Sequence, residues 1–474
     1  MSEKRTTITS PPELDAEMTP AVRAFVEVLL ARIESLETEV SELKRLIGMN
    51  PQNASLPPSS EHPHTKKRMP KRKSSGRKRG GQKGHTKHQR TLVPSEQVTE
   101  TITLWPPRCR RCGETLKGND PNPLRHQVFE LPEIKPIITE YQRHRLRCPC
   151  CHVSTTAPLP DGVPQGQTGP RLTAFTALLM AYFRQSKRRT ALFLQALCNI
   201  PCSAALTVKL QNTTTRALRP CYEQMRQSLP RSDAVAMDET PAKEANRKAW
   251  LWTAVTKHFT LFHIAKTRKA SVAKELLGED FSGILTSDRY GGYDWVRKQQ
   301  LCWAHLLRDF QSLIDVGGKA KPIGRRLKAC AQQLFHHWHR YRDGTIVRGT
   351  MRRNIHKLWW PVYETLEAST LKLRGKQAGT CRHILNRFDS LWTFLDSEDV
   401  EPTNNVSERS LRHAVIWRKL SFGTQSVTGS RFVETLLSVI ETCRQQNRDV
   451  FAFVTEAVQS HFDADPAPKL QFGV

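Results

Sequence analysis

Three carboxylates in this chain could together hold a pair of divalent metal ions. Asp238 closes the apolar run AVAMDET, and Asp288 closes a second run, GILTSDRY. Glu408 lies in TNNVSERSLRHAV, whose pattern predicts a helix. Carboxylates placed at two strand ends and on one helix can converge on two metal ions, which clamp the attacking and leaving oxygens of a phosphodiester. Three acids among 45 Asp and Glu arise easily by chance, so this pattern alone is weak.

The elements that must position these acids form an alternating pattern over residues 233–303. Five runs have strand character, and a helical run, KASVAKELLGE, separates the third from the fourth. This order predicts an α/β layer. If the first and fourth strands are neighbours, Asp238 and Asp288 can share a metal. Successive strand residues point to opposite faces, so Asp238 and Glu239 cannot both enter one site from a regular strand. We favour Asp238 as the ligand because it ends the apolar run, and expect Glu239 among the residues that surround the ligands.

The charge of the chain points to a polyanionic partner. The net charge is +28 over 474 residues, a length that allows about three domains. Residues 64–90 hold twelve Lys or Arg and no acid, which predicts a segment that is disordered when free and can follow phosphates without reading sequence. A generally basic, solvated surface is the alternative. The cations expected to contact DNA here are Lys66, Lys67, Arg68, Lys71, Arg72, Lys73, Arg77, Lys78 and Arg79.

The twelve cysteines are expected to be free thiols or metal ligands. No signal peptide pattern is present, and the longest apolar run, residues 172–183, is too short to cross a bilayer, so we expect a soluble cytoplasmic protein. Two Cys-x2-Cys knuckles, separated by 35 residues, predict a structural Zn²⁺ site whose ligands would be Cys109, Cys112, Cys148 and Cys151. Cys150 is an alternative ligand. Short β-like runs between the knuckles could bring them together. Most of the other cysteines are expected in the core: Cys198, Cys202, Cys221, Cys302, Cys330, Cys381 and Cys443.

Helical patterns precede the α/β layer. A heptad seam predicts a coiled coil that joins copies of the chain, with docking on its own domain as the alternative; the seam residues are Val22, Val26, Leu29, Ile33, Leu36, Val40, Leu43 and Ile47. Three helical runs over 170–225, with the short turn NIPCS between the second and third, have helix–turn–helix spacing. An ordinary helical bundle fits that pattern equally well.

The chain resembles the bacterial transposases of the insertion-sequence-66 family, a group of DDE transposases. The matching segments are GGQKGH (80–85), the two cysteine knuckles, AMDETP (236–241), SDRYGGY (287–293), CWAHLLRDF (302–310) and EPTNNVSERSLRHAVIWRK (401–419). The resemblance implies a catalytic core of the RNase H-like fold, with Asp238, Asp288 and Glu408 as the catalytic triad. It also implies a helical insertion between the second Asp and the Glu, an interval that here spans 119 residues and is predicted to be helical.

The function implied is that of a DNA transposase. Such an enzyme binds terminal inverted repeats of double-stranded DNA and, with Mg²⁺ or Mn²⁺, cleaves the ends and transfers strands. We expect a homo-oligomer formed through the coiled coil, association with the nucleoid when bound to DNA, and possible help from small accessory proteins of the same element. The alternatives are a domesticated DNA-binding regulator and an RNase H-like nuclease without strand transfer.

Other residues in the matching segments support weaker expectations. Arg409 and Arg412 on the Glu408 helix could contact phosphate or be solvated. Cys302 and His305 have metal-like spacing but are expected to pack the edge of the core. Two further expectations are an ion pair between Arg308 and Asp309, and a tyrosine-bearing turn, rather than base stacking, for Tyr290 and Tyr293.

The predicted organisation is multidomain. Its parts are a coiled coil (20–48), a basic linker and arm (49–94), a zinc-binding module (95–160), a helix–turn–helix-like region (168–228), the first part of the RNase H-like core (232–303), a helical insertion (304–400), the rest of the core with the Glu-bearing helix (401–460) and a tail (461–474).

Overall fold

The computed structural model describes residues 19–47 and 90–472 of the chain. Most of the basic stretch, with its nine named cations, and the segment GGQKGH lie outside the described residues. The heptad segment forms one helix, α2 (Pro20–Ile47), close to the predicted bounds. The seam residues Leu29, Ile33 and Leu36 are exposed on it. Their pairing with a second copy remains a prediction.

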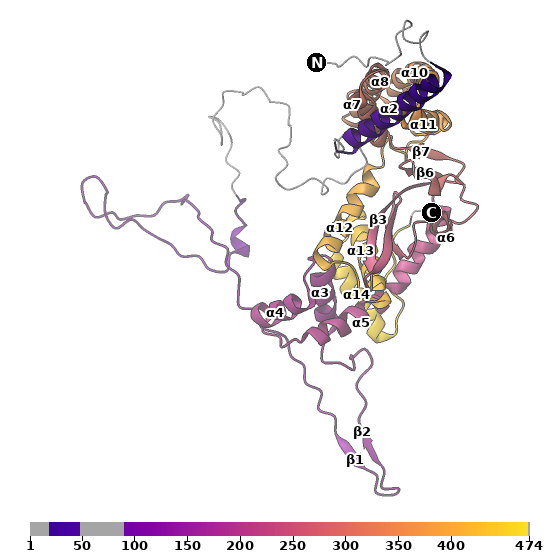
Figure 1. Ribbon diagram of the computed structural model, residues 1–474. Coiled ribbons are helices and arrows are strands. Elements are labelled where there is room, and N and C mark those ends of the chain that lie inside the picture. Colours follow the sequence, from indigo (N-terminus) through magenta and orange to yellow (C-terminus); the bar gives the residue numbers. More distant parts are fainter. Residues whose placement is uncertain (1–18, 48–89, 473–474) are drawn as a thin grey trace.

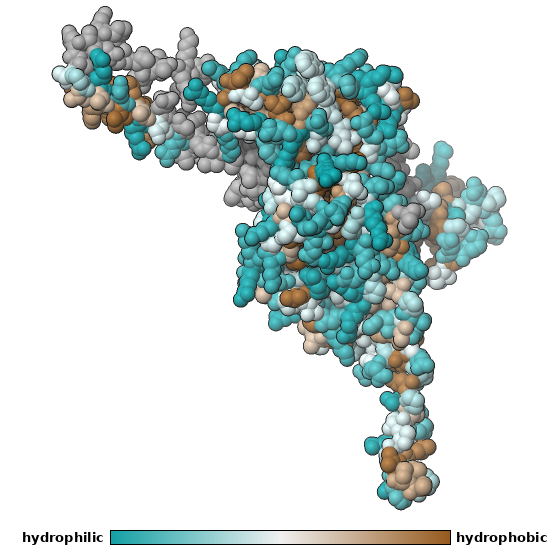
Figure 2. All heavy atoms as spheres, turned by 90° about the vertical axis from the view of Figure 1, so that its right-hand side faces the viewer, coloured by the Kyte–Doolittle hydropathy of each residue, from teal (hydrophilic) through white to brown (hydrophobic). Residues whose placement is uncertain are grey.

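Residues 90–160 extend away from the rest of the molecule on two arms (Figure 1). They contain a short 3-10 helix, η2 (Ser95–Gln97), and one antiparallel hairpin of β1 (Arg145–Arg147) and β2 (Ser154–Thr156). The β-like runs expected between the knuckles are otherwise wrong, because residues 116–144 form no strand. Their large apolar side chains are exposed to solvent, as the 99% exposure of Ile137 illustrates. Figure 2 shows apolar colour on the hairpin that projects at the bottom, where Leu146 and Val153 are exposed.

Three helices follow where the sequence predicts them: α3 (Pro170–Ala181), α4 (Lys187–Cys198) and α5 (Ala204–Ser228). The boundaries have local causes. The Ser186 and Ser203 hydroxyls accept hydrogen bonds from amides in the first turns of α4 and α5, and Asn199 ends α4 in the left-handed conformation. Helix α5 packs on α3 and on two later helices, and its residues Leu210 and Leu218 are buried. One face of the proposed recognition helix therefore belongs to the core, and its use in a major groove remains a prediction.

A five-stranded mixed sheet lies at the centre of the fold (Figure 1). Its strands are β3 (Ala234–Glu244), β4 (Arg247–Val255), β5 (Thr260–Ala265), β6 (Ile284–Ser287) and β7 (Gln299–Leu301), with α6 (Ala270–Leu277) between β5 and β6. The spatial order is β5-β4-β3-β6-β7; β3 to β5 are antiparallel, whereas β6 and β7 run parallel to β3. Ala245 and Asn246 both have positive φ and form the tight turn between β3 and β4. The five strands lie where the sequence predicts them.

Three C-terminal helices pack around this sheet: α12 (Asn405–Ser421), α13 (Val427–Gln445) and α14 (Val450–Asp463). The apolar pattern of residues 430–460 would suit one long helix, but the segment forms two, α13 and α14. The break falls at Asn447, which has a φ of +53° that a continuous helix cannot contain. This arrangement leaves α13 free to lie along β5, where the Ser438 hydroxyl accepts the amide hydrogen of Phe262 at 2.8 Å.

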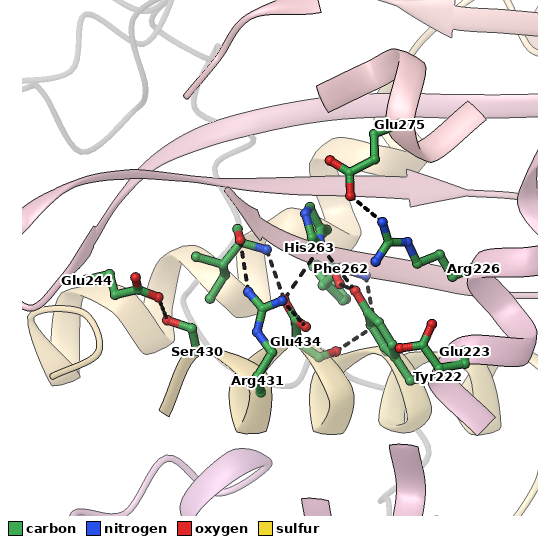
Figure 3. Close-up of polar contacts among 12 residues, drawn as sticks. Tyr222, Glu223, Arg226, Glu244, Phe262, His263, Glu275, Ser430, Arg431 and Glu434 are labelled. Carbon is green, nitrogen blue, oxygen red and sulfur yellow. Dashed lines mark hydrogen bonds and ion pairs between the residues drawn. The ribbon is translucent and has the colours of Figure 1, made fainter. Parts of the chain in front are cut away.

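A buried carboxylate joins α13 to β5 (Figure 3). Glu434 is fully buried, and its oxygens accept hydrogen bonds from the Ile264 amide at 3.1 Å and lie 3.1 Å from Arg431. Arg219 of α5 is a second cation, 3.2 Å away. The His263 ring lies against the same carboxylate, 3.6 Å from it. A buried charge that is paired and hydrogen-bonded in this way fixes how the helices sit on the sheet.

The predicted helical insertion is present and has its own core. It contains α7 (Trp303–Val316), α8 (Ala320–Arg342), α9 (Arg348–His356), α10 (Trp359–Lys372) and α11 (Gly375–Leu385), followed by the 3-10 turns η5 (Phe388–Leu391) and η6 (Thr393–Leu395). Its core surrounds Trp303, Phe310 and Leu327, whereas most of the sheet shares a different core with α3, α5, α6 and the three C-terminal helices. The helices gather at the β6–β7 end of the sheet (Figure 1). Within the described ranges, no helix is long and apolar enough to cross a membrane.

Most of the cysteines outside the two knuckles are buried, as predicted. Cys198, Cys221, Cys330 and Cys443 are buried, and burial raises the pKa of the Cys221 thiol to about 11. These thiols are small core residues with little tendency to ionise.

Candidate active site

The pairing of β3 with β6 brings two of the predicted carboxylates to one edge of the sheet. The two strands run parallel, with Ala234 opposite Ile284 and Ala236 opposite Thr286. The same register, continued by two residues, sets Asp238 opposite Asp288, the residue after the last one of β6. The carboxyl ends of parallel strands are where open α/β sheets place their ligand sites.

Helix α12 delivers Glu408 to this edge, and Asn404 holds the helix there. The fully buried Asn404 amide donates from Nδ2 to the Met237 carbonyl at 2.8 Å, immediately before Asp238. Its backbone N–H donates to Cys302 Sγ at 3.1 Å, which ties the start of α12 to the start of α7. Glu408 lies one turn further along, and its N–H donates to the Asn404 carbonyl. Asn404 was missed by the sequence reasoning, although it lies within the matching segment 401–419.

The electrostatics of the site favour a cation. Burial raises the pKa of Asp238 well above its usual range, and the negative charges of Glu239, Asp288 and Glu408 raise it further. The side chain of Asp238 accepts one hydrogen bond, from the Glu239 amide at 2.9 Å, and Asp288 accepts one from the Tyr290 amide at 2.8 Å. A cluster of carboxylate oxygens with this excess of negative charge fits a hard divalent ion such as Mg²⁺.

Glu239 has a structural role on the other face of β3. Arg268 donates from Nε to Glu239 Oε1 at 2.7 Å, and the Tyr293 hydroxyl donates to Oε2 at 2.6 Å. Tyr293 is itself buried. The Arg268 guanidinium lies over the Tyr290 ring, 3.9 Å from the ring centroid. Both tyrosines therefore belong to a packed turn, as expected, and the buried Tyr293 ring is not free to stack on a base.

One expectation about α7 is wrong. Asp309 pairs with Arg289, the residue after Asp288, and not with Arg308. Consecutive helical residues point in different directions, so Arg308 instead faces Glu408, 4.0 Å away.

Cys302 and His305 pack at the edge of the core, as expected, but they also lie beside Glu408. One ligand atom each from Cys302, His305 and Glu408 lie within 4.8 Å of one another, the one such group of three found among the described residues. The signal available in the sequence was the Cys-x2-His spacing itself, to which a third ligand is added only where the start of α12 meets the start of α7.

Arg409 and Arg412 are exposed on α12, beyond Glu408. Their side chains are therefore accessible to a polyanion, and a phosphate contact remains a prediction.

The two cysteine knuckles form separate turns. The Cys109 amide donates to Glu114 O, and the Cys148 amide donates to Val153 O; in each knuckle, hydrogen bonds from the backbone N–H groups lower the pKa of the first cysteine. Such N–H groups stabilise a thiolate ligand. The knuckles lie on the two different arms in Figure 1, and no group of three ligands forms from them in the described part of the chain. The structure thus contains both halves of the predicted zinc site without bringing them together.

Comparison with known proteins assigns to one family the part of the chain that holds the three carboxylates. Residues 165–431 match the Transposase IS66 family, a span that contains all three carboxylates and the insertion, and residues 7–91 match a family of unknown function. The chain is also similar to two uncharacterized proteins of Sinorhizobium fredii (strain NBRC 101917 / NGR234). It is 23% identical to y4qI over 79% of this chain and 74% of that protein, and 24% identical to y4hP over 77% and 72% respectively. The matched span exceeds half of the chain, so this protein belongs to the IS66 family of transposases.

Proposed function

We propose that this protein is a DNA transposase that cuts the ends of its element and joins them to target DNA by the DDE mechanism. The observation that carries the proposal is the convergence of Asp238, Asp288 and Glu408 from β3, the end of β6 and α12. The order β5-β4-β3-β6-β7, antiparallel in its first three strands and parallel beyond, supports an RNase H-like core. The family supports a polynucleotidyl transferase activity.

The three carboxylates would act as ligands of Mg²⁺ or Mn²⁺. When bound, such ions lower the pKa of the attacking hydroxyl group and stabilise the negative charge that develops on the leaving oxygen. The chain itself keeps the ligands in place. Asn404 holds α12 against the end of β3, and the Tyr290 amide orients the Asp288 carboxylate. A water molecule would attack at the element end, and the freed 3′-OH would attack the target at the same site.

DNA would be held by surfaces away from the carboxylates. The basic stretch of residues 64–90 would track phosphates, and the exposed Arg409 and Arg412 could add contacts close to the cut. The zinc module and α5 are the candidates for reading the terminal repeats, and α2 would pair two copies so that both ends are processed together. Small accessory proteins and association with the nucleoid belong to the same proposal.

The test uses the full chain and the ends of its own element. Asp238→Asn, Asp288→Asn and Glu408→Gln should each abolish cleavage while end binding, measured by gel shift, stays near the wild-type level. Asp233→Asn is the matched control, because this exposed acid lies immediately before β3, far along the strand from Asp238. Near-normal cleavage by Glu408→Gln would refute the assignment of the third acid.

A pre-cut end separates the proposal from its alternatives. A transposase joins the free 3′-OH to target DNA, whereas a nuclease of the same fold hydrolyses but does not join, and a regulator does neither. Absence of joined product from the wild-type protein with either Mg²⁺ or Mn²⁺ would exclude strand transfer.

A further inference from the structure

A second set of ligands adjoins the catalytic carboxylates. Cys302 immediately precedes α7, and His305 follows three residues later, so both side chains lie on one side of the helix start. Glu408 approaches from the first turn of α12, and its Oε1 lies 3.7 Å from His305 Nδ1. The hydrogen bond from the Asn404 backbone N–H to Cys302 Sγ fixes the two helix starts against each other.

Two of these ligand atoms are buried without a hydrogen-bond partner. Within the described residues, His305 Nδ1 and Glu408 Oε1 have none, and their separation of 3.7 Å is too long for a hydrogen bond between them. An imidazole nitrogen and a carboxylate oxygen that are buried side by side with no hydrogen bond between them form an arrangement that a cation would satisfy.

The donor types select the kind of cation. A thiolate, an imidazole and a carboxylate together suit Zn²⁺ and similar ions, whereas Mg²⁺ prefers oxygen ligands alone. In a tetrahedral zinc site, nitrogen and oxygen ligands at their usual bond lengths lie about 3.3 Å apart, close to the separation of His305 Nδ1 and Glu408 Oε1. Three protein ligands with one open position is also a familiar zinc coordination.

We propose that Cys302, His305 and Glu408 form a binding site for Zn²⁺ or another soft divalent ion, and that its occupation withdraws Glu408 from Asp238 and Asp288 and so inhibits the enzyme. The inhibition, though not the binding, rests on the proposed function. Glu408 would be a ligand in both metal sites, because its carboxylate can face either α7 or the strand ends.

Binding is tested on the full chain with Co²⁺ as a spectroscopic probe. Wild-type protein should gain thiolate-to-cobalt absorption that Cys302→Ser lacks, in addition to any absorption from the cysteine knuckles, which both proteins share. Cys330→Ser is the matched control, because Cys330 is a buried thiol of the insertion outside the cluster. Thermal unfolding adds a second readout: Zn²⁺ should raise the Tm of wild type and Cys330→Ser by more than that of Cys302→Ser. Equal cobalt spectra for wild type and Cys302→Ser would overturn the site.

Inhibition is tested by adding Zn²⁺ to end cleavage in excess Mg²⁺, with each variant compared with its own zinc-free rate. The zinc concentration that halves cleavage should rise at least tenfold in Cys302→Ser and in His305→Gln, and stay unchanged in Cys330→Ser. Equal zinc sensitivity of all four proteins would mean that zinc acts at the Asp pair, and would refute the inhibitory role. If the wild-type protein cleaves no DNA with any metal, the proposed function fails while the cobalt result still decides the site.

Discussion

Asn404→Ala should separate the positioning of Glu408 from the stability of the fold. The substitution removes the Nδ2–H that the Met237 carbonyl accepts at 2.8 Å and leaves that buried carbonyl unpaired. An unpaired buried acceptor costs about 1–3 kcal/mol, so the Tm should fall by several degrees. The backbone contact of Asn404 with Cys302 Sγ is unaffected, and α12 should still form.

The effect on catalysis should exceed the effect on stability. Without the amide, the first turn of α12 is no longer tied to the residue before Asp238, and Glu408 can drift from the strand ends. A displacement of about 1 Å at a reacting centre costs roughly 10²-fold in rate. Cleavage of end DNA should therefore fall by about that factor, while gel-shift affinity for the same DNA stays unchanged.

Ser438→Ala is the control for stability alone. It leaves the buried amide of Phe262 without its acceptor, a comparable loss at a site on α13 away from the carboxylates. Both variants are assayed at a temperature well below either Tm. If Asn404→Ala cleaves as well as Ser438→Ala, Asn404 stabilises the fold but does not position Glu408, and the reasoning is refuted.

Three further predictions concern other parts of the molecule. Cys109→Ser combined with Cys112→Ser should remove about one equivalent of tightly bound Zn²⁺ per chain by elemental analysis, and an unchanged zinc content would rule out the cysteine module. Leu36→Lys places a charge on the apolar seam of α2 and should abolish paired-end complexes but not single-end complexes, as seen by light scattering and two-end gel shift; normal pairing would assign the seam to docking within one chain. Burial holds the pKa of His263 at about 3, below its usual 6.5, so the folded protein excludes a proton that the unfolded chain binds. The free energy of unfolding should consequently fall as pH drops from about 6.5 towards 3, by up to about 1.4 kcal/mol per pH unit, and His263→Gln should flatten that slope in urea titrations at several pH values.

Local patterns in the sequence were sufficient to predict the elements. The five strand-like runs became β3 to β7 because alternating or continuous apolar residues with β-branched and aromatic side chains suit a half-buried sheet. The helical patterns of residues 170–225 and 304–400 predicted helices for the same local reasons, and in the structure Ser186 and Ser203 cap two of them. Local patterns failed where an outcome needed a partner. The runs around Ile137 have strand character, yet they form no strand, because a strand requires a neighbour to complete its hydrogen bonds.

The sequence by itself determined which carboxylates stand at strand and helix ends, the family of the chain, and its large positive charge. Only the tertiary structure decided which of these groups meet. Asp238 and Asp288 became neighbours through the parallel pairing of β3 with β6, and Glu408 reached them through the bond between Asn404 and Met237, whose positions are 167 residues apart. The contact between the starts of α12 and α7 brought Cys302 and His305 beside Glu408, which makes the three a candidate metal site. Contacts between distant segments depend on how whole elements bury their apolar faces, which no local pattern of residues specifies.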